Sequence, residues 1–464
     1  MNKDLRSFLS QLAKMGDREI VRVRREVDPR FELNTVVAKL EQEGKYPAVY
    51  FGKVKGSRIP VVTNLCSTYE KLALALDTKL DTLVEEYAAR ERRPVATRTV
   101  SNAPVKETIL TGEKADLGIL PIPTHNALDG GPYISSGIGI TKDPETGRQN
   151  AGVYRHMVYG SQTMGVYMVR AHHIFYLWRR YSERQEEMDI AIALGHHPAL
   201  MLGAISRHPG AGGELEVAGA LLGEPLEVVP AETVDLLVPA SAEIIVEGKI
   251  IPGELHEEGP FGEWPRYYTS FGPQPYMRVT AITMRRDPIY LDVCAAHSDH
   301  LVVGGLPRMG SLLMRVREVV PTVKAVNMPM SGGARAHCYI SMKKQTEGEP
   351  KQAAFAALTV ENDIKMVIVV DEDINAFNEA EVLWAVATRF EADRDLIVMP
   401  NCQGIELIPT AYGHNRNEHG NMNTKLILDA TKPCPPVPFP ERADVPQDLL
   451  RSLNLSEYVV PYGS

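Results

Sequence analysis

Apolar residues recur at helical spacing near the start of the chain and then give way to short apolar runs. The apolar positions of the first segment are Leu5, Phe8, Leu9 and Leu12. Their spacing predicts an amphipathic helix, and the segment has no unbroken apolar core of the kind that marks a signal peptide. Apolar strands at 48–51 and 59–62 alternate with a helical pattern at 31–40. This alternation predicts a small α/β domain over residues 1–105.

The pattern changes at residues 119–123, which read ILPIP. From there to about residue 300 the sequence is rich in β-branched residues, Gly and Pro, with short strands between turn signals. Such a composition predicts a mostly β domain, for which a barrel is one architecture. We place this domain at residues 106–305.

Predicted helices and strands alternate again from about residue 308. The helices are expected at 312–319, 352–358 and 381–390, and the strands at 336–342 and 366–370. This order is typical of a βαβ-type domain, which we place at residues 306–440. A proline-rich segment at 432–438 excludes regular helix or sheet interior. In the tail of residues 441–464 a helix is predicted at 447–453, and we expect it to pack on a partner subunit.

Composition and charge narrow the class of protein. With 464 residues, 44% of them hydrophobic, the chain has material for two or three domains with a buried core. Acidic residues outnumber basic ones by 59 to 50 and no long Lys/Arg cluster occurs, so we expect no nucleic-acid partner. Five scattered cysteines favour a reducing cytoplasm, and no apolar run reaches the length of a membrane span.

Two glutamates flank a short turn in the segment 256–264, which reads HEEGPFGEW. The Gly-Pro-Phe-Gly turn between Glu258 and Glu263 can fold both carboxylates toward one cleft. Charge repulsion and desolvation raise a carboxyl pKa, so such a pair would hold one proton near neutral pH and supply a general acid. The alternative is a surface turn whose glutamates are solvated.

A second set of polar residues offers ligands for a hard cation. It comprises Asn150 and Arg155 of the segment NAGVYR, the pair His172 and His173, and Glu214. Asn, His and Glu supply oxygen and nitrogen ligands for Mg²⁺ or Mn²⁺, and no thiol lies nearby to favour a soft metal. Arg155 can pair bidentately with a carboxylate, which would keep one glutamate ionised while the other stays protonated. The structural alternatives are a hydrogen-bonded histidine and an ordinary salt bridge.

Together these segments resemble the UbiD family of reversible decarboxylases, and the likeness spans nearly the whole chain. The segments that carry it are LPI at 120–122, DGGPYI at 129–134, ITKDPETG at 140–147, NAGVYR at 150–155, ELEVAG at 214–219, VPA at 238–240, EIIVEG at 243–248, EGPFGE at 258–263, VVDEDI at 369–374 and LWA at 383–385. The resemblance implies an α+β fold. It comprises an N-terminal α/β domain, a central split β-barrel that binds the flavin, and a C-terminal α/β dimerisation domain.

The resemblance also implies a cofactor and its site. The cofactor is prenylated FMN, whose phosphate is anchored by a divalent metal, usually Mn²⁺, with K⁺ nearby. The metal ligands carry over onto Asn150, His173 and Glu214, with His172 as the alternative to His173. The residues implied to contact the cofactor are Val153, Tyr154, Arg155, His172, His173 and, at the phosphate, Lys365.

The family's Glu-Arg-Glu network carries over onto Glu258, Arg155 and Glu263, with Glu263 as the proton donor. The implied activity is non-oxidative, reversible decarboxylation of an aromatic, heteroaromatic or α,β-unsaturated acid. A flavin prenyltransferase is expected to supply the cofactor, and the chain is expected to form a homodimer or larger homo-oligomer.

For the substrate we expect furan-2,5-dicarboxylate, converted to 2-furoate and CO2. The reason is that His300 and Arg308 can hydrogen-bond a second carboxylate. Alternatively these two residues serve a domain hinge or a helix start at Gly310, and the substrate is a hydroxybenzoate or pyrrole-2-carboxylate. Two other classes stay open, an FMN reductase and a non-catalytic flavin-binding subunit.

Overall fold

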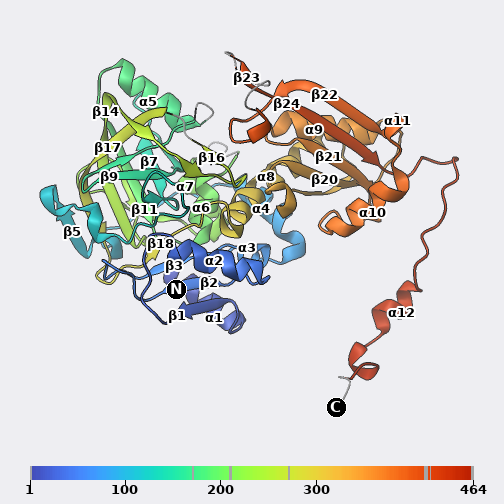
Figure 1. Cartoon of the computed structure of the whole chain (residues 1–464), viewed down its shortest axis with the longest axis horizontal. Helices are drawn as coiled ribbons and strands as arrows, with labels where there is room; N and C mark the ends of the chain where they lie inside the picture. Colours follow the sequence, from blue (N-terminus) through green and yellow to red (C-terminus); the bar gives the residue numbers. More distant parts are fainter. Residues whose placement is uncertain are drawn as a thin grey trace.

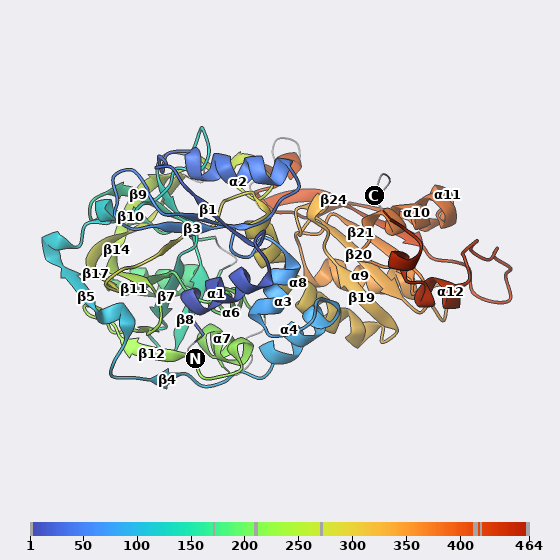
Figure 2. The ribbon, with the colours of Figure 1, turned by 90° about the horizontal axis from the view of Figure 1, so that it is seen from below.

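The computed structural model describes residues 3–169, 172–207, 212–269, 272–411, 416–417 and 420–460. Three sheets dominate it: an N-terminal sheet, a large central sheet and a C-terminal sheet (Figure 1). The long helix α8 (Ser298–Val319) lies between the central and C-terminal sheets, as the view from below also shows (Figure 2). Helices and sheets are mixed throughout, which confirms the predicted α+β class.

The N-terminal sheet takes its last strand from far along the chain. In spatial order its strands are β1 (Ile20–Val23), β2 (Ala48–Phe51), β3 (Val61–Thr63) and β18 (Tyr290–Leu291). The accompanying helices are α1 (Leu5–Met15), α2 (Glu32–Gln42), α3 (Tyr69–Ala75) and α4 (Leu83–Glu91). Helix α1 buries Leu5, Phe8 and Leu12, as their spacing predicts. Because β18 runs parallel to β3, the segment between β18 and α8 starts from the N-terminal sheet.

The central sheet has nine strands, and all of its pairings are antiparallel. They are β5 (Thr108–Thr111), β6 (Tyr133–Ile134), β7 (Ile138–Lys142), β8 (Gln149–Val153), β9 (His156–Gly160), β10 (Thr163–Gly165), β11 (Met188–Leu194), β14 (Ile244–Glu258) and β17 (Gly272–Met284). The apolar run of β11 lies in its middle, between β14 and β7. The pairings between described residues run from β6 to β8 without joining these two ends, so closure into a split barrel stays a prediction.

Shorter elements surround this sheet. The helices are α5 (His173–Glu183), α6 (Pro198–Ala204) and α7 (Glu214–Leu222). A three-stranded sheet comprises β13 (Leu237–Pro239), β12 (Glu227–Pro230) and β4 (Arg98–Thr99). A hairpin of β15 (Phe261–Gly262) and β16 (Tyr268–Thr269) follows β14 and carries the predicted glutamate turn.

The C-terminal sheet mixes parallel and antiparallel strands. Its strands are β19 (Val323–Asn327), β20 (His337–Met342), β21 (Met366–Asp371), β24 (Gly420–Ala430) and β22 (Leu396–Gln403), with β23 (Arg416–Asn417) paired to β24. Its helices are α9 (Glu349–Val360), α10 (Glu379–Arg389) and α11 (Ala392–Asp395). The parallel pairing of β20, β21 and β24 agrees with the predicted βαβ pattern.

Helix α8 corrects one prediction. A helix was expected only at 312–319, but it begins at Ser298 and contains Pro307. Its glycines suggest a broken helix, yet they allow close packing. A Cβ atom at Gly305 would lie 2.7 Å from Tyr69 Oη, and one at Gly310 would lie 2.8 Å from the Tyr87 ring. Tertiary contacts therefore override local propensity here.

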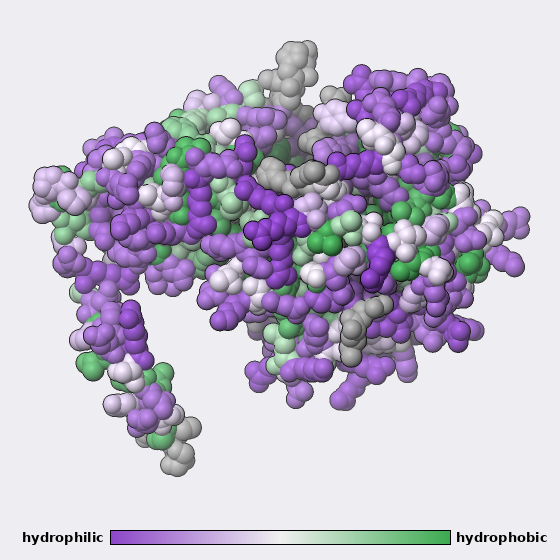
Figure 3. Space-filling view, turned by 180° about the vertical axis from the view of Figure 1, so that it is seen from behind, coloured by the Kyte–Doolittle hydropathy of each residue, from purple (hydrophilic) through white to green (hydrophobic). Residues whose placement is uncertain are grey.

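The C-terminal tail stands away from the body and carries helix α12 (Gln447–Ser452), where a helix was predicted (Figure 1). Its large apolar side chains face solvent, and they alternate with hydrophilic residues along the tail (Figure 3). No helix among the described residues combines the length and apolar character needed to cross a membrane.

Candidate active site

Arg155 joins the two glutamates of the 258–263 turn. Arg155 lies between β8 and β9, Glu258 ends β14, and Glu263 follows β15. The guanidinium donates from Nε to Glu258 Oε1 at 2.9 Å and from Nη2 to Glu258 Oε2 at 2.7 Å, a bidentate pair. Its Nη1 donates to Glu263 Oε1. All three residues are buried, so the structure brings the three predicted catalytic side chains together.

Three aromatic residues surround this cluster. Tyr133 donates its hydroxyl to Glu258 Oε1 at 3.1 Å. The Arg155 Cζ atom lies 3.9 Å from the ring centroid of Tyr167 and 4.8 Å from that of Phe261, within the range of cation–π attraction. Neither tyrosine was predicted as a site residue, although Tyr133 belongs to the DGGPYI segment that signals the family.

The loop at residues 129–131 holds the glutamate turn. Gly130 donates its N–H to Pro260 O at 2.7 Å, and Gly262 donates its N–H to Asp129 Oδ1 at 2.9 Å. A Cβ atom at Gly130 would lie 2.4 Å from the carbonyl oxygen of Gly259. Only glycine allows this approach of two backbones, which explains the small residue at this position.

The charge state of Glu263 differs from the expectation. Burial alone would raise its pKa, but the charge of Arg155, then that of the His300 ring in its protonated form and that of Arg335, outweigh burial and hold the pKa below its ordinary value. This direction runs against the expectation that burial and a neighbouring carboxylate raise a carboxyl pKa, and the shared proton stays a prediction. The physical reason is that Arg155 donates to both carboxylates and offsets their mutual repulsion.

Two of the predicted metal ligands lie side by side. Asn150 on β8 donates from Nδ2 to Oε1 of Glu214, the first residue of α7, at 3.2 Å. The Ala151 N–H donates to Glu214 Oε2 at 3.2 Å. The Asn150 Oδ1 atom is buried and has no hydrogen-bond partner among the described residues. His172 and His173 are exposed at the start of α5. Among the described residues, no hydrogen bond joins either ring to Asn150 or Glu214.

Of the residues implied to contact the flavin, Val153, Tyr154 and His172 lie near one another, and Lys365 lies in another part of the chain. Tyr154 is buried, and its ring centroid lies 6.1 Å from that of His172. A Cβ atom at Gly152 would lie 2.2 Å from Tyr154 Oη, so glycine makes room for this ring. Val153, beside it, is half-buried at the end of β8. Lys365 lies in the C-terminal part, where its Nζ donates to Thr410 Oγ1 at 3.0 Å.

His300 and Arg335 form a polar group near Glu263. Arg335 Nη2 lies 3.5 Å from His300 Nε2, and Arg335 Cζ lies 5.0 Å from the ring centroid of Trp264. Burial, and then the charge of Arg335, lower the pKa of His300 to about 4, so the ring is neutral near pH 7. Arg335 Nε is buried without a hydrogen-bond partner in the described part of the chain. Such a group can bind a carboxylate, to which the guanidinium would donate hydrogen bonds.

Arg308, the second predicted substrate residue, faces acidic side chains of the C-terminal part. Its Nη1 donates to Gly304 O at 2.7 Å. Its Nη2 lies 3.4 Å from Asp363 Oδ2, and its Nε lies 3.4 Å from Glu361 Oε2. These contacts favour the hinge alternative for Arg308, whereas Arg335 was not predicted because its neighbours Gly332 and Gly333 indicate only a turn.

Models of three domains of 3-octaprenyl-4-hydroxybenzoate carboxy-lyase match the chain in order. The UbiD N-terminal domain matches residues 9–91, the Rift-related domain 98–298 and the C-terminal domain 301–430. The chain belongs to the UbiD family.

Curated relatives of this UbiD-family chain include two decarboxylases. Anhydromevalonate phosphate decarboxylase of Methanothermobacter thermautotrophicus is 35% identical over 429 residues, which cover 92% of this chain and 97% of the relative. Phenolic acid decarboxylase of Sedimentibacter hydroxybenzoicus is 34% identical over 464 residues, which cover 96% of this chain and 94% of the relative.

Solved UbiD-class structures share the fold over almost the whole length. HmfF from Pelotomaculum thermopropionicum in complex with FMN gives a TM-score of 0.90 at 41% identity, over 98% of this chain and 100% of that chain. An evolved dimeric form of HmfF in complex with prFMN gives 0.88 at 39% identity, over 99% and 100%. The UbiD-family chain is therefore a carboxy-lyase whose structural neighbours bind FMN or prenylated FMN.

Proposed function

We propose that this UbiD-family enzyme removes one carboxylate from furan-2,5-dicarboxylate without oxidation and forms 2-furoate and CO2. The observation that carries the proposal is the pair of Arg335 and His300 beside Glu263. A monocarboxylate needs only the reacting end of the site, whereas a second carboxylate matches the unpaired Arg335 Nε atom. Arg308 lies near enough for its charge to lower the pKa of Arg335 after burial does, but its own ion pairs are with Asp363 and Glu361.

The described residues fit the metal that the family implies. Among the residues that the structure describes, the buried Asn150 Oδ1 atom beside the Glu214 carboxylate has no partner, and a hard cation such as Mn²⁺ binds both kinds of oxygen. His173, or His172 in its place, would supply the nitrogen ligand, with K⁺ nearby. In this proposal Val153, Tyr154 and Arg155 face the prenylated flavin, and Lys365 contacts its phosphate.

Prenylated FMN, when bound, supplies the electron sink that an aromatic decarboxylation requires. The protein supplies orientation and a proton. Arg155 orients Glu263, and Glu263 donates a proton to the ring carbon from which CO2 has left. Because the pKa of Glu263 is held low, Glu263 must first take up a proton from solvent, and a nearby substrate dianion favours this uptake by like-charge repulsion. The reverse carboxylation uses the same residues.

A phenolic acid is the second candidate substrate, because one curated relative is a phenolic acid decarboxylase. A phenol hydroxyl can hydrogen-bond His300 and leaves Arg335 without a role in recognition. The two substrates therefore differ in their dependence on Arg335.

The substrate test compares furan-2,5-dicarboxylate, furan-2-carboxylate and a hydroxybenzoate with enzyme produced alongside a flavin prenyltransferase. We expect wild type to prefer the dicarboxylate and Arg335→Ala to raise its KM by about 10- to 100-fold, the range for a lost charged hydrogen bond. Arg308→Ala serves as the matched variant, since Arg308 already contacts Asp363 and Glu361. Turnover of the hydroxybenzoate alone, or a dicarboxylate KM that is unchanged in Arg335→Ala, rejects this substrate.

The proposed assembly is a homodimer or larger homo-oligomer in the cytoplasm. The tail supports self-association, because Leu449, Leu455 and Tyr458 are 64%, 67% and 72% exposed. A solved relative is an evolved dimeric form. The five cysteines are all free, which suits a reducing compartment. Light scattering of full-length protein tests the assembly.

A further inference from the structure

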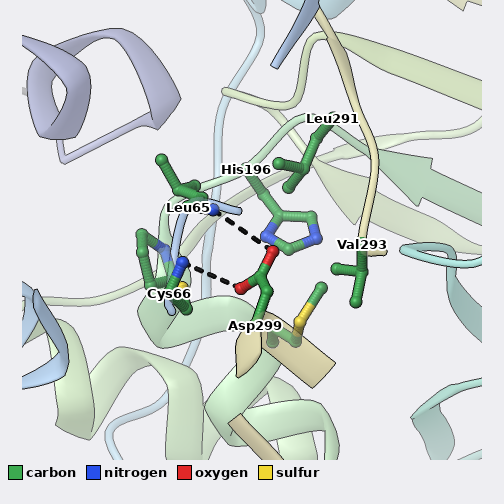
Figure 4. A pocket seen from close by; sticks show the side chains of 8 residues that line it. Leu65, Cys66, His196, Leu291, Val293 and Asp299 are labelled. Carbon is green, nitrogen blue, oxygen red and sulfur yellow. Dashed lines mark hydrogen bonds between the residues drawn. The ribbon is translucent and has the colours of Figure 1, made fainter. Parts of the chain in front are cut away.

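The N-terminal part holds the start of α8 through two carboxylates. Asp299, in the first turn of α8, accepts the N–H groups of Leu65 at 3.2 Å and of Cys66 at 2.8 Å. Figure 4 shows this carboxylate pointing at the two backbone nitrogens that follow β3. The next residue, His300, therefore stands on a helical turn whose position is fixed from the N-terminal sheet.

The second carboxylate belongs to Glu41 near the end of α2. Its Oε1 accepts the Ser298 N–H at 2.8 Å, and its Oε2 lies 2.7 Å from His297 Nδ1. The side chain is only 9% exposed. Burial would raise the pKa of Glu41, but hydrogen bonds from His297 and from the Ser298 N–H lower it below its ordinary value. Glu41 is therefore an ionised cap of the helix that carries His300.

Glu41 also reaches the turn that carries Glu263. Arg266 Nη2 lies 3.7 Å from Glu41 Oε2. Arg266 donates its own N–H to Glu263 O at 2.8 Å and its Nε to Ala296 O at 3.1 Å. Arg266 and Ala296 both have φ near +64°, a conformation that persists only where surrounding contacts hold it. One carboxylate thus touches both segments that meet at the candidate active site.

We propose that Glu41 is a positioning residue that sets the turn carrying Glu263 against the helix start carrying His300. The inference rests on the roles proposed above for Glu263 and His300. Glu41 itself contacts neither side chain, and it acts through Arg266, His297 and Ser298. A displacement of reacting groups by about 1 Å can cost on the order of a hundredfold in rate. A residue such as Glu41, which only holds the segments that carry these groups, can therefore affect turnover.

The test uses holoenzyme produced with a flavin prenyltransferase and any substrate that the wild type turns over. We expect Glu41→Ala to lower kcat by about 10- to 100-fold while KM and flavin content stay near wild type and Tm changes by no more than about 3 °C. The kcat of Glu41→Gln should lie between those of wild type and Glu41→Ala, because the amide oxygen still accepts the Ser298 N–H. Glu43→Ala is the matched control, since Glu43 ends the same helix but is 44% exposed and pairs with Lys45.

A double-mutant cycle with Arg266→Ala checks the link to the Glu263 turn. If Glu41 acts through Arg266, the effects of the two alanine variants on kcat are less than additive. Fully additive effects overturn the proposal, as does a fall in kcat that only follows the loss of flavin or folded protein. If Glu41→Ala does not fold, wild-type kcat in Glu41→Gln overturns it. Wild-type rates in Glu263→Gln would instead reject the proposed proton donor, which is a separate outcome.

Discussion

The Arg155 cluster and the Asn150–Glu214 pair differ in how far the protein alone completes them. In the first, Arg155 donates to Glu258 and Glu263, and Tyr133 adds a further hydrogen bond. In the second, the Asn150 Oδ1 atom is buried without a partner among the described residues. Because buried polar groups are nearly always paired, we expect the first region to keep its geometry without a ligand and the second to gain a partner when the proposed ligand binds.

This difference separates two kinds of residue in the proposed reaction. Side chains that move or orient a proton are held by other side chains, so their geometry exists before a substrate binds. Side chains that hold the metal and the flavin reach their final geometry only with those groups. Changes in the first region should therefore reduce turnover, and changes in the second should reduce cofactor content.

The largest expected effect concerns the group that the second region is proposed to receive. Protein produced without a flavin prenyltransferase should be inactive even when it binds FMN, because the proposed chemistry resides in the prenyl-derived ring. Decarboxylase assays and absorption spectra of protein from matched expressions, with and without the prenyltransferase, provide the check. Full activity with plain FMN would reject the proposed cofactor.

The second-largest expected effect concerns the Arg155 cluster. Glu263→Gln should lower kcat by on the order of a hundredfold or more, as expected for a lost general acid. Flavin content should stay near wild type and the loss of Tm near pH 7 should be small, because the amide can still accept a hydrogen bond from Arg155. Single-turnover kinetics measure the change, and a wild-type rate would show that another group donates the proton.

Local sequence patterns predicted more of the fold than of the site chemistry. The buried face of α1 follows from the helical spacing of its apolar residues, and the strand β21 follows from its continuous apolar run. The early start of α8 does not, since Gly305 and Gly310 read as breaks until their contacts with Tyr69 and Tyr87 are known. Packing partners that are distant in sequence decide such cases.

The same limit applies to the candidate site. The proximity of Glu258 and Glu263 follows from the four-residue turn between them, but the sign of the Glu263 pKa shift depends on one guanidinium reaching both carboxylates. Arg335 contacts His300 across a sequence separation of 35 residues, and no local motif marks it. Charge balance at a buried site is thus a property of the tertiary structure.

A smaller effect is expected for a change in the Asn150–Glu214 pair. Glu214→Gln should lower metal and flavin retention after gel filtration by about tenfold, the lower end for weakened metal sites. Tm should change little, because the Gln amide oxygen can still accept one of the two hydrogen bonds that Glu214 accepts from Asn150 and Ala151. Glu224→Gln, at an exposed position just after the same helix, is the control. Equal retention in both variants would contradict a metal at Asn150 and Glu214.

The smallest expected effect is a change in stability with pH, and it tests the charge state of the first region directly. The pKa of Glu263 in the folded chain lies below its ordinary value of 4.5. A carboxyl with a lowered pKa stabilises the fold above its unfolded pKa, and this contribution is lost as the pH falls through the folded pKa. The Tm advantage of wild type over Glu263→Gln should therefore shrink as the pH falls below about 4.5.

Asp373 offers a comparison within the same protein for this pH measurement. Burial would raise the pKa of Asp373, but hydrogen bonds from Arg389 and Lys432 lower it to about 2. The advantage of wild type over Asp373→Asn should accordingly decline only below about pH 3.8 and extend toward pH 2. Differential scanning fluorimetry of cofactor-free protein between pH 7 and pH 2 covers both windows. An advantage over Glu263→Gln that grows as the pH falls would mean that burial outweighs Arg155 and raises the pKa of Glu263 above its ordinary value.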